Sequence, residues 1–170
     1  MMDKKTREIL NAQGRVGTNI VEVSEMSVAI DLLNKLIATN RGLITVYRTA
    51  VERLENESNK ELLQGYVKQH EAFVTELSNL VTSYGGTPVT AADSSSLVKK
   101  AWVTLKSAVT EGDGPMLAEV AQDAEKILEA YGEAMGKDLP DDARDLIRQH
   151  MSQINVNHEK LSALSAVYNQ

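Results

Sequence analysis

The sequence contains no cysteine. Disulfide bonds, thiolate metal ligands and cysteine nucleophiles are therefore excluded, and a reducing cytoplasm is the compartment that we expect. Only three prolines occur in the 170 residues, so long stretches are free of helix breakers. Aromatic residues make up only 4% of the chain. Aliphatic side chains must therefore fill the interior, as they do between packed helices.

Long apolar runs are absent too. No segment approaches the ~18 apolar residues of a membrane-spanning helix, and no signal-peptide run follows the charged residues Met1–Arg7. The net charge of -6 argues against nucleic acid or an anionic membrane as the main partner. At this length we expect one cytoplasmic domain with a single core.

Apolar residues recur at alternating steps of three and four from Asp31 onward, which predicts four amphipathic helices. Short polar turns separate the members of each helix pair, so each pair is expected to form an antiparallel hairpin. The predicted buried positions are Leu36, Asn40, Leu43, Tyr47, Ala50 and Leu54; then Leu63, Val67, His70, Val74, Leu77, Val81 and Tyr84; then Leu117, Val120, Ala124, Ile127, Tyr131 and Ala134; and finally Ile147, Met151, Ile154, His158, Leu161 and Tyr168.

Helix boundaries are marked by familiar signals. Ser58-x-x-Glu61 predicts a capping box at the start of the second helix, and Gly85-Gly86 predicts its end. Asp113-Gly114-Pro115 starts the third helix, with proline tolerated in the first turn. Leu139–Asp142 forms the second hairpin turn, with its acids at the positive end of the fourth helix dipole.

The two hairpins match each other without a gap at an offset of 84 residues. Any two amphipathic hairpins share leucines in register, but matched tyrosines and equal spacing across a turn favour a true repeat. The identical pairs include Tyr47/Tyr131, Ala50/Ala134, Leu62/Leu146, Gln69/Gln153, Leu77/Leu161, Ser78/Ser162, Leu80/Leu164 and Tyr84/Tyr168.

Residues 85–114 are too many for the usual helix–helix turn of ~2–8 residues. A shorter helix is expected near Leu97–Val109, with Trp102 anchoring it, and it can carry the chain back along the bundle. The predicted fold is therefore all-α: a ferritin-like four-helix bundle of two repeated hairpins with a crossover helix. A plain up-down-up-down bundle is the alternative.

Residues 1–26 differ from the rest. Gly14 and Gly17 interrupt them, and Ile20, Val21 and Val23 form only a brief β-like run. We interpret this segment as an N-terminal tail or docking arm, with a flexible tail favoured, and residues 27–170 as the ferritin-like four-helix-bundle domain.

Several motifs together resemble a bacterial ferritin-like four-helix-bundle family of unknown function. The resemblance covers residues 31–168 and implies the fold; that family brings no agreed activity, substrate or cofactor. The motifs are Gly85-Gly86-x-Pro88, Trp102-x-x-Leu105-Lys106, Tyr131-x-x-Ala134-Met135, Leu139-Pro140 and His158-x-x-Leu161.

A ferritin-like di-iron site needs Glu-x-x-His on one helix of each hairpin, because residues three apart share a helix face. The sequence has no such motif: Val67, Ile147 and Asn155 precede the three histidines by three positions. A weaker hypothesis is a degenerate metal site near the middle of the bundle, at the level of Asn40. Its candidate ligands are His70, Glu71, Gln122, Glu125 and His158.

Two functional hypotheses follow. The preferred one is a non-catalytic bundle, with no cofactor, that acts through self-association or a protein partner in a stress-related setting. In it the polar residues form a structural layer, since a buried asparagine often fixes helix register. The alternative is an iron-, manganese- or zinc-binding protein or a metal-dependent oxidase. Whether the protein is an enzyme is left open.

Overall fold

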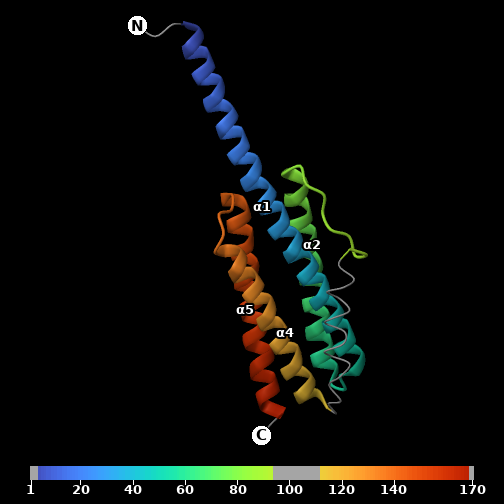
Figure 1. Cartoon of the computed structure of the whole chain (residues 1–170). Coiled ribbons are helices and arrows are strands. Elements are labelled where there is room, and N and C mark those ends of the chain that lie inside the picture. Colours follow the sequence, from blue (N-terminus) through green and yellow to red (C-terminus); the bar gives the residue numbers. More distant parts are fainter. Residues whose placement is uncertain (1–3, 94–111, 169–170) are drawn as a thin grey trace.

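The computed structural model describes residues 4–93 and 112–168 of the chain. Its helices are α1 (Lys4–Arg53), α2 (Glu57–Ser83), α4 (Asp113–Met135) and α5 (Asp141–Tyr168), and the described residues include no strand. The all-α prediction is confirmed (Figure 1). The predicted crossover helix around Trp102 lies outside the described residues.

Hydrogen bonds between helix ends define the order and direction of the helices. Asn59, in the first turn of α2, donates to Asp113 at the start of α4 (2.8 Å) and to Tyr168 at the end of α5 (2.8 Å). At the opposite end, Tyr84 after α2 bonds Asp142 at the start of α5. Helices α2 and α4 are therefore parallel, and their connection joins opposite ends of the bundle. This is the one-crossover topology of ferritin-like folds, so the up-down-up-down alternative is wrong.

The repeat has a clear structural counterpart. Helix α2 begins at Glu57 and α5 at Asp141, which are 84 positions apart. The Gln69 side chain donates to that of Gln153, its own repeat partner, across the bundle (2.7 Å). Such a contact between equivalent residues is what an internal two-fold axis produces.

Helices α1 and α4 bury every position that the spacing predicts for them. In α2, Phe73 is buried and the predicted Val74 is only half-buried. In α5, His150 is buried in place of Met151 and Asn157 in place of His158. The predicted Tyr84 is half-buried and Tyr168 is 46% exposed. These shifts arise because a 3.6-residue helix makes neighbouring positions near the edge of the apolar stripe hard to distinguish.

The α2 caps differ in part from the prediction. Asn56, not Ser58, is the N-cap: its side-chain oxygen accepts the Asn59 backbone N–H at 3.2 Å. The stop at Gly85 is as expected, since this residue has φ +79°. The Gly86 N–H then bonds the Val81 carbonyl at 2.9 Å, which is a Schellman ending.

A buried carboxylate ties the first hairpin turn to the second hairpin. Asp113 accepts the backbone N–H groups of Glu55 (2.8 Å) and Asn56 (3.1 Å) besides the side-chain amide of Asn59. Burial acts to raise the pKa of Asp113, but these donors outweigh it and hold the pKa below its usual value. A Cβ added at the neighbouring Gly114 would overlap the Tyr168 side chain.

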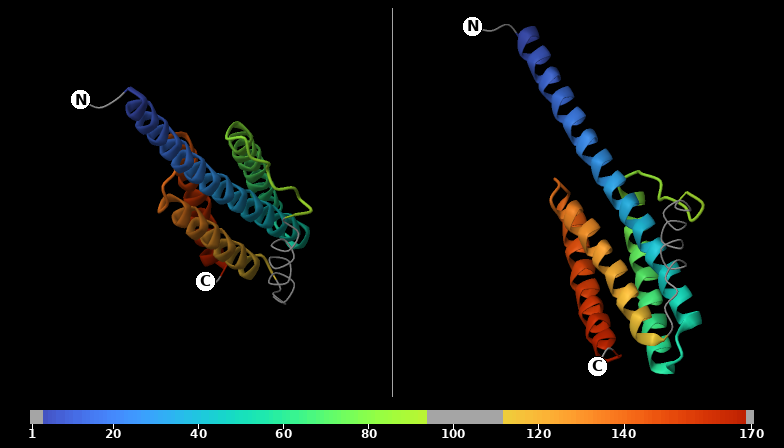
Figure 2. Two further views of the ribbon diagram at one scale, coloured as in Figure 1. Left: turned by 45° about the horizontal axis from the view of Figure 1, so that its top comes forward. Right: turned by 60° about the horizontal axis from the view of Figure 1, so that its bottom comes forward.

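The N-terminal segment is helical in its backbone from Lys4, so α1 has 50 residues, and the β-like run at Ile20 lies within it. The structure therefore gives a helix where the sequence favoured a flexible tail. Its first part extends past the other helices as a projecting arm (Figures 1 and 2). The division of the chain at residue 26 stays a prediction, because the backbone runs through it without a break. None of the described helices is long and apolar enough to cross a membrane.

Candidate functional site

A chain of hydrogen-bonded side chains crosses the middle of the bundle and joins all four of the described helices. His70 Nδ1 lies 2.6 Å from Asn40 Oδ1, and Asn40 Nδ2 lies 2.8 Å from the Tyr131 hydroxyl. Tyr131 continues to His150 Nδ1 at 3.2 Å, and His150 Nε2 reaches Glu76 Oε2 at 2.6 Å. The first four side chains are fully buried, whereas the Glu76 side chain is 46% exposed. The chain therefore links the core to the surface.

The hydrogen-bond pattern assigns the protons along this chain. The Asn40 amide nitrogen also donates to the Leu36 carbonyl (2.8 Å), so the amide oxygen faces His70 and accepts its Nδ1 proton. Tyr131 accepts from Asn40 and hence donates to His150 Nδ1. His150 then carries its proton on Nε2 and donates to Glu76. Every donor points toward the exposed carboxylate.

Burial keeps both histidines neutral. It lowers the pKa of His70 to about 3, with a further lowering from His150. Burial also lowers the pKa of His150, and it outweighs the hydrogen bond and charge of Glu76, which act to raise it. The pKa of Tyr131 is raised, chiefly by burial, so the phenol keeps its proton.

Aromatic rings are scarce in this chain, yet they cluster around the same residues. Three of the five tyrosines and the single phenylalanine join the two buried histidines in one run of adjoining rings. The run is Tyr66–Tyr47–His70–Phe73–His150–Tyr131, with successive centroid separations of 5.9, 5.5, 5.2, 3.9 and 6.0 Å.

The repeat partner of Tyr131 has a different environment. Tyr47 contacts Tyr66 at 5.9 Å, much as Tyr131 contacts His150, but the repeat partner of Asn40 is an alanine, Ala124. The buried Tyr47 hydroxyl has no hydrogen-bond partner among the described residues. Of the two tyrosines related by the repeat, only Tyr131 therefore belongs to a complete hydrogen-bonded chain among the described residues.

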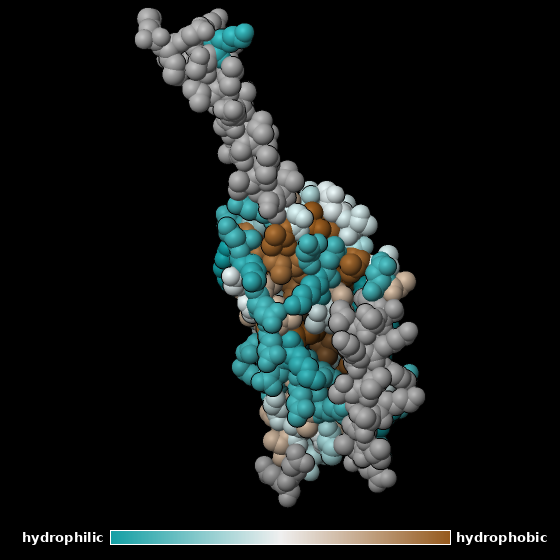
Figure 3. Space-filling model, in the orientation of Figure 1, coloured by the Kyte–Doolittle hydropathy of each residue, from teal (hydrophilic) through white to brown (hydrophobic). Residues whose placement is uncertain are grey.

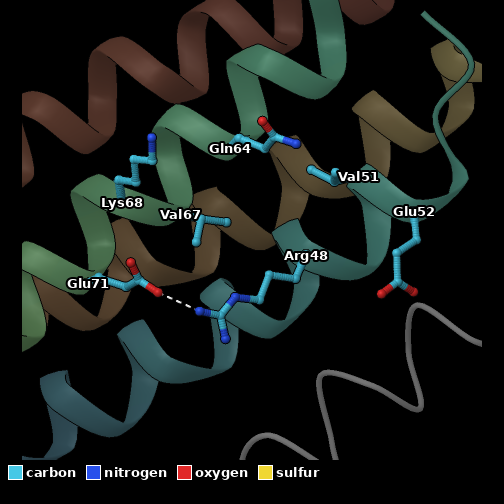
Figure 4. Close-up of a pocket in the computed structure, with 7 residues that line it drawn as sticks. All are labelled: Arg48, Val51, Glu52, Gln64, Val67, Lys68 and Glu71. Atoms are coloured by element: carbon cyan, nitrogen blue, oxygen red, sulfur yellow. Dashed lines mark hydrogen bonds and ion pairs between the residues drawn. The ribbon is translucent and has the colours of Figure 1, made fainter. Parts of the chain in front are cut away.

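Of the five predicted metal ligands, only His70 lies in this chain. Glu71 follows it by one residue and is thereby rotated ~100° around α2 toward solvent. There it forms an ion pair with Arg48 (Figure 4). Both line a surface groove of about 460 Å³ between α1 and α2, where Val67 forms part of the floor.

The other three candidates do not join His70 either. Gln122 and Glu125 are exposed on α4, on either side of the buried Ala124, and His158 is half-buried. The part of the chain that the structure describes holds no group of three side chains suited to a metal ion. The geometry thus does not favour the metal hypothesis, which stays a prediction that anaerobic loading with ferrous iron and metal analysis tests.

Sequence reasoning missed His150 and Glu76 as members of the site. A signal for His150 was present, because it lies three residues after Ile147 and four before Ile154, both fully buried. Glu76 had no such signal, since its importance comes from a contact with another helix. Asn40 and Tyr131 were placed correctly as buried positions, but their contact across 91 residues was not foreseen.

The fold has a counterpart among solved structures. A mutant of Dps1 from Mycobacterium smegmatis is similar with a TM-score of 0.73 and 17% sequence identity. The similarity covers 84% of this chain and 97% of that one, and it shows a ferritin-like four-helix bundle. Residues 28–137 match the family DUF2383, described as a domain of unknown function, and the chain belongs to that family. The resemblance inferred from the motifs is confirmed. No curated protein sequence matches the chain.

Proposed function

We propose that the protein acts by self-association through the N-terminal arm of α1, rather than by catalytic turnover. The observation that carries this proposal is the length of α1. Its 50 residues correspond to about 75 Å of helix, against about 40 Å for the 27 residues of α2. The arm thus extends well beyond the helices against which the rest of α1 packs (Figure 1).

The sequence of the arm supports a helical partner. An apolar residue occurs at every seventh position: Ile9, Val16, Val23, Ile30 and Ile37. The last of these is fully buried in the bundle core, and Ile30 packs against that core. The spacing that buries one face of α1 in the bundle thus continues along the arm without a break. A sustained seven-residue repeat is typical of helices that pack along one another.

A second copy of the same arm is the partner that we infer. By itself the arm, which is the part of α1 before residue 27, would be only marginally stable as a helix in water. Gly14 and Gly17 weaken the helix further, so packing against a partner must supply its stability. Most oligomers are built from identical subunits. Hydrophobic residues also gather on the bundle surface beside the base of the arm (Figure 3). A pocket of about 270 Å³ lies between α1 and the α4–α5 turn, and it is lined by Glu25, Met26, Asp138, Leu139 and Pro140.

The test compares two double variants of the full chain by light scattering. The first double variant, Val16→Asp with Val23→Asp, places two charges on the apolar repeat. The second, Asn11→Asp with Thr18→Asp, also places two charges seven residues apart, but on the opposite face of the helix. The unchanged chain and the second variant should have masses above the 18.6 kDa of one copy, and the first variant should be a monomer. A monomeric unchanged chain, or equal masses for both variants, would refute the proposal.

The stress-related setting is a separate part of the proposal. It is tested by comparing the survival of cells with and without the gene under oxidative challenge.

A further inference from the structure

The hydrogen-bonded chain through the bundle gives Tyr131 a property that the other buried tyrosine lacks. Its hydroxyl donates to a neutral imidazole, and that imidazole donates to a carboxylate at the surface. A phenol that loses an electron must also lose its proton, because a charged phenol radical is a strong acid and a buried positive charge is costly. His150 and Glu76 provide an ordered path for that proton.

We propose that Tyr131 is a redox-active tyrosine that donates single electrons to one-electron oxidants, such as small diffusible radicals. The oxidant gains one electron and is reduced. The phenolic proton of Tyr131 moves to His150 Nδ1, and the Nε2 proton of His150 moves to the Glu76 carboxylate. The products are a neutral tyrosyl radical, a neutral imidazole and a carboxylic acid that exchanges its proton with solvent.

The run of aromatic rings supplies a route for the electron. It connects Tyr131 through His150, Phe73, His70 and Tyr47 to Tyr66, with no centroid separation above 6.0 Å. Tyr66, at the outer end of this run, is itself buried, and only 8% of its surface is exposed. An oxidant that contacts this exposed edge need not enter the core to take an electron from Tyr131.

Burial gives the radical a long lifetime. Tyr131 is fully buried, so its ring cannot meet a second tyrosyl radical from another molecule, and small reductants have no direct access. Tyr47 is equally buried, but its hydroxyl has no acceptor among the described residues. Oxidation of Tyr47 would leave its proton in place, and the radical should therefore end up on Tyr131, which can pass its proton on.

The experiment generates oxidants by flash photolysis of a ruthenium tris-bipyridine complex with a sacrificial acceptor. Electron paramagnetic resonance then follows the radical in the full-length protein, in Tyr131→Phe and in Tyr47→Phe. Oxidation of other aromatic residues contributes to all three, so the comparison isolates the buried pair. We expect the long-lived tyrosyl signal to persist in Tyr47→Phe, because phenylalanine keeps the ring at this point of the run. The signal should fall severalfold in Tyr131→Phe. An unchanged signal in Tyr131→Phe would overturn the proposal.

A second measurement decides the matter without any substitution, in case Tyr131→Phe does not fold. Unchanged protein labelled with ¹⁵N-histidine should show coupling between the tyrosyl radical and one imidazole nitrogen, because His150 Nδ1 lies 3.2 Å from the Tyr131 oxygen. A radical with no ¹⁵N coupling would place the electron loss elsewhere and reject the assignment.

Discussion

The two repeat-related tyrosines allow an isosteric comparison of a satisfied and an unsatisfied buried hydroxyl. Tyr47 and Tyr131 are both fully buried, and each contacts a ring at its repeat-equivalent neighbour. Replacing either by phenylalanine removes one oxygen and leaves the ring. The two substitutions therefore differ in what the lost hydroxyl was bonded to.

Tyr131→Phe leaves one Asn40 N–H and the His150 Nδ1 lone pair buried without their partner. Each unsatisfied group costs about 1–3 kcal/mol, so the two together should lower the free energy of unfolding by about 2–6 kcal/mol. Tyr47→Phe removes a hydroxyl with no partner among the described residues. It should be neutral or stabilise the protein by up to ~2 kcal/mol, because an unpaired hydroxyl no longer has to be desolvated.

Urea unfolding followed by far-ultraviolet circular dichroism measures both free energies. The slope of the unfolding free energy against urea concentration, the m value, should be the same in all three proteins, since the surface exposed on unfolding hardly changes. In a chain of this size each kcal/mol also shifts Tm by about 2–4 °C. Equal losses in the two variants would refute the reasoning, because they would show that ring packing alone sets the effect.

Three further predictions concern other parts of the fold. Gly114→Ala should lower the free energy of unfolding by about 1–3 kcal/mol, because the new Cβ overlaps Tyr168. Gly132→Ala, in the same helix but with open space around it, should raise that free energy by about 1 kcal/mol. Thermal unfolding of the two variants measures both effects. Asp113→Asn should lower the free energy of unfolding in urea by about 1–3 kcal/mol, since an amide group would face N–H donors. The lowered pKa of Asp113 makes the stability of the unchanged protein fall with pH below about 4, and this contribution should disappear in the variant. Lowering the pH from 7 to 5 should cost roughly 2 kcal/mol through His70, because its folded pKa of about 3 lies below the unfolded 6.5 and only the unfolded chain takes up the proton. His70→Asn should lessen that pH dependence, and an identical pH profile in the variant would contradict the assignment.

Much of the fold could be predicted from the sequence because it depends on short-range spacing. The steps of three and four fixed the buried faces of α1 and α4 correctly, since every predicted position there is buried. The 84-residue offset and the length of residues 85–114 predicted two hairpins and a crossover. The cap of α2 was misplaced because Asn56 and Ser58 are both good N-cap residues and lie two positions apart.

The candidate site was predicted less well, for a geometric reason. Each residue turns a helix by ~100°, so Glu71 faces Arg48 at the surface while His70 faces the core. Spacing along α2 could place His70 inside, but it could not show which side chain from another helix meets it.

The sequence by itself determined that the chain forms two related, amphipathic hairpins, because apolar period and repeat offset are properties of the chain alone. The tertiary structure decided that Asn40, Tyr131, His150 and Glu76 form one hydrogen-bonded chain with His70. These contacts depend on how far the helices slide and rotate against one another. That register is set by packing over the whole core, which no single helix encodes.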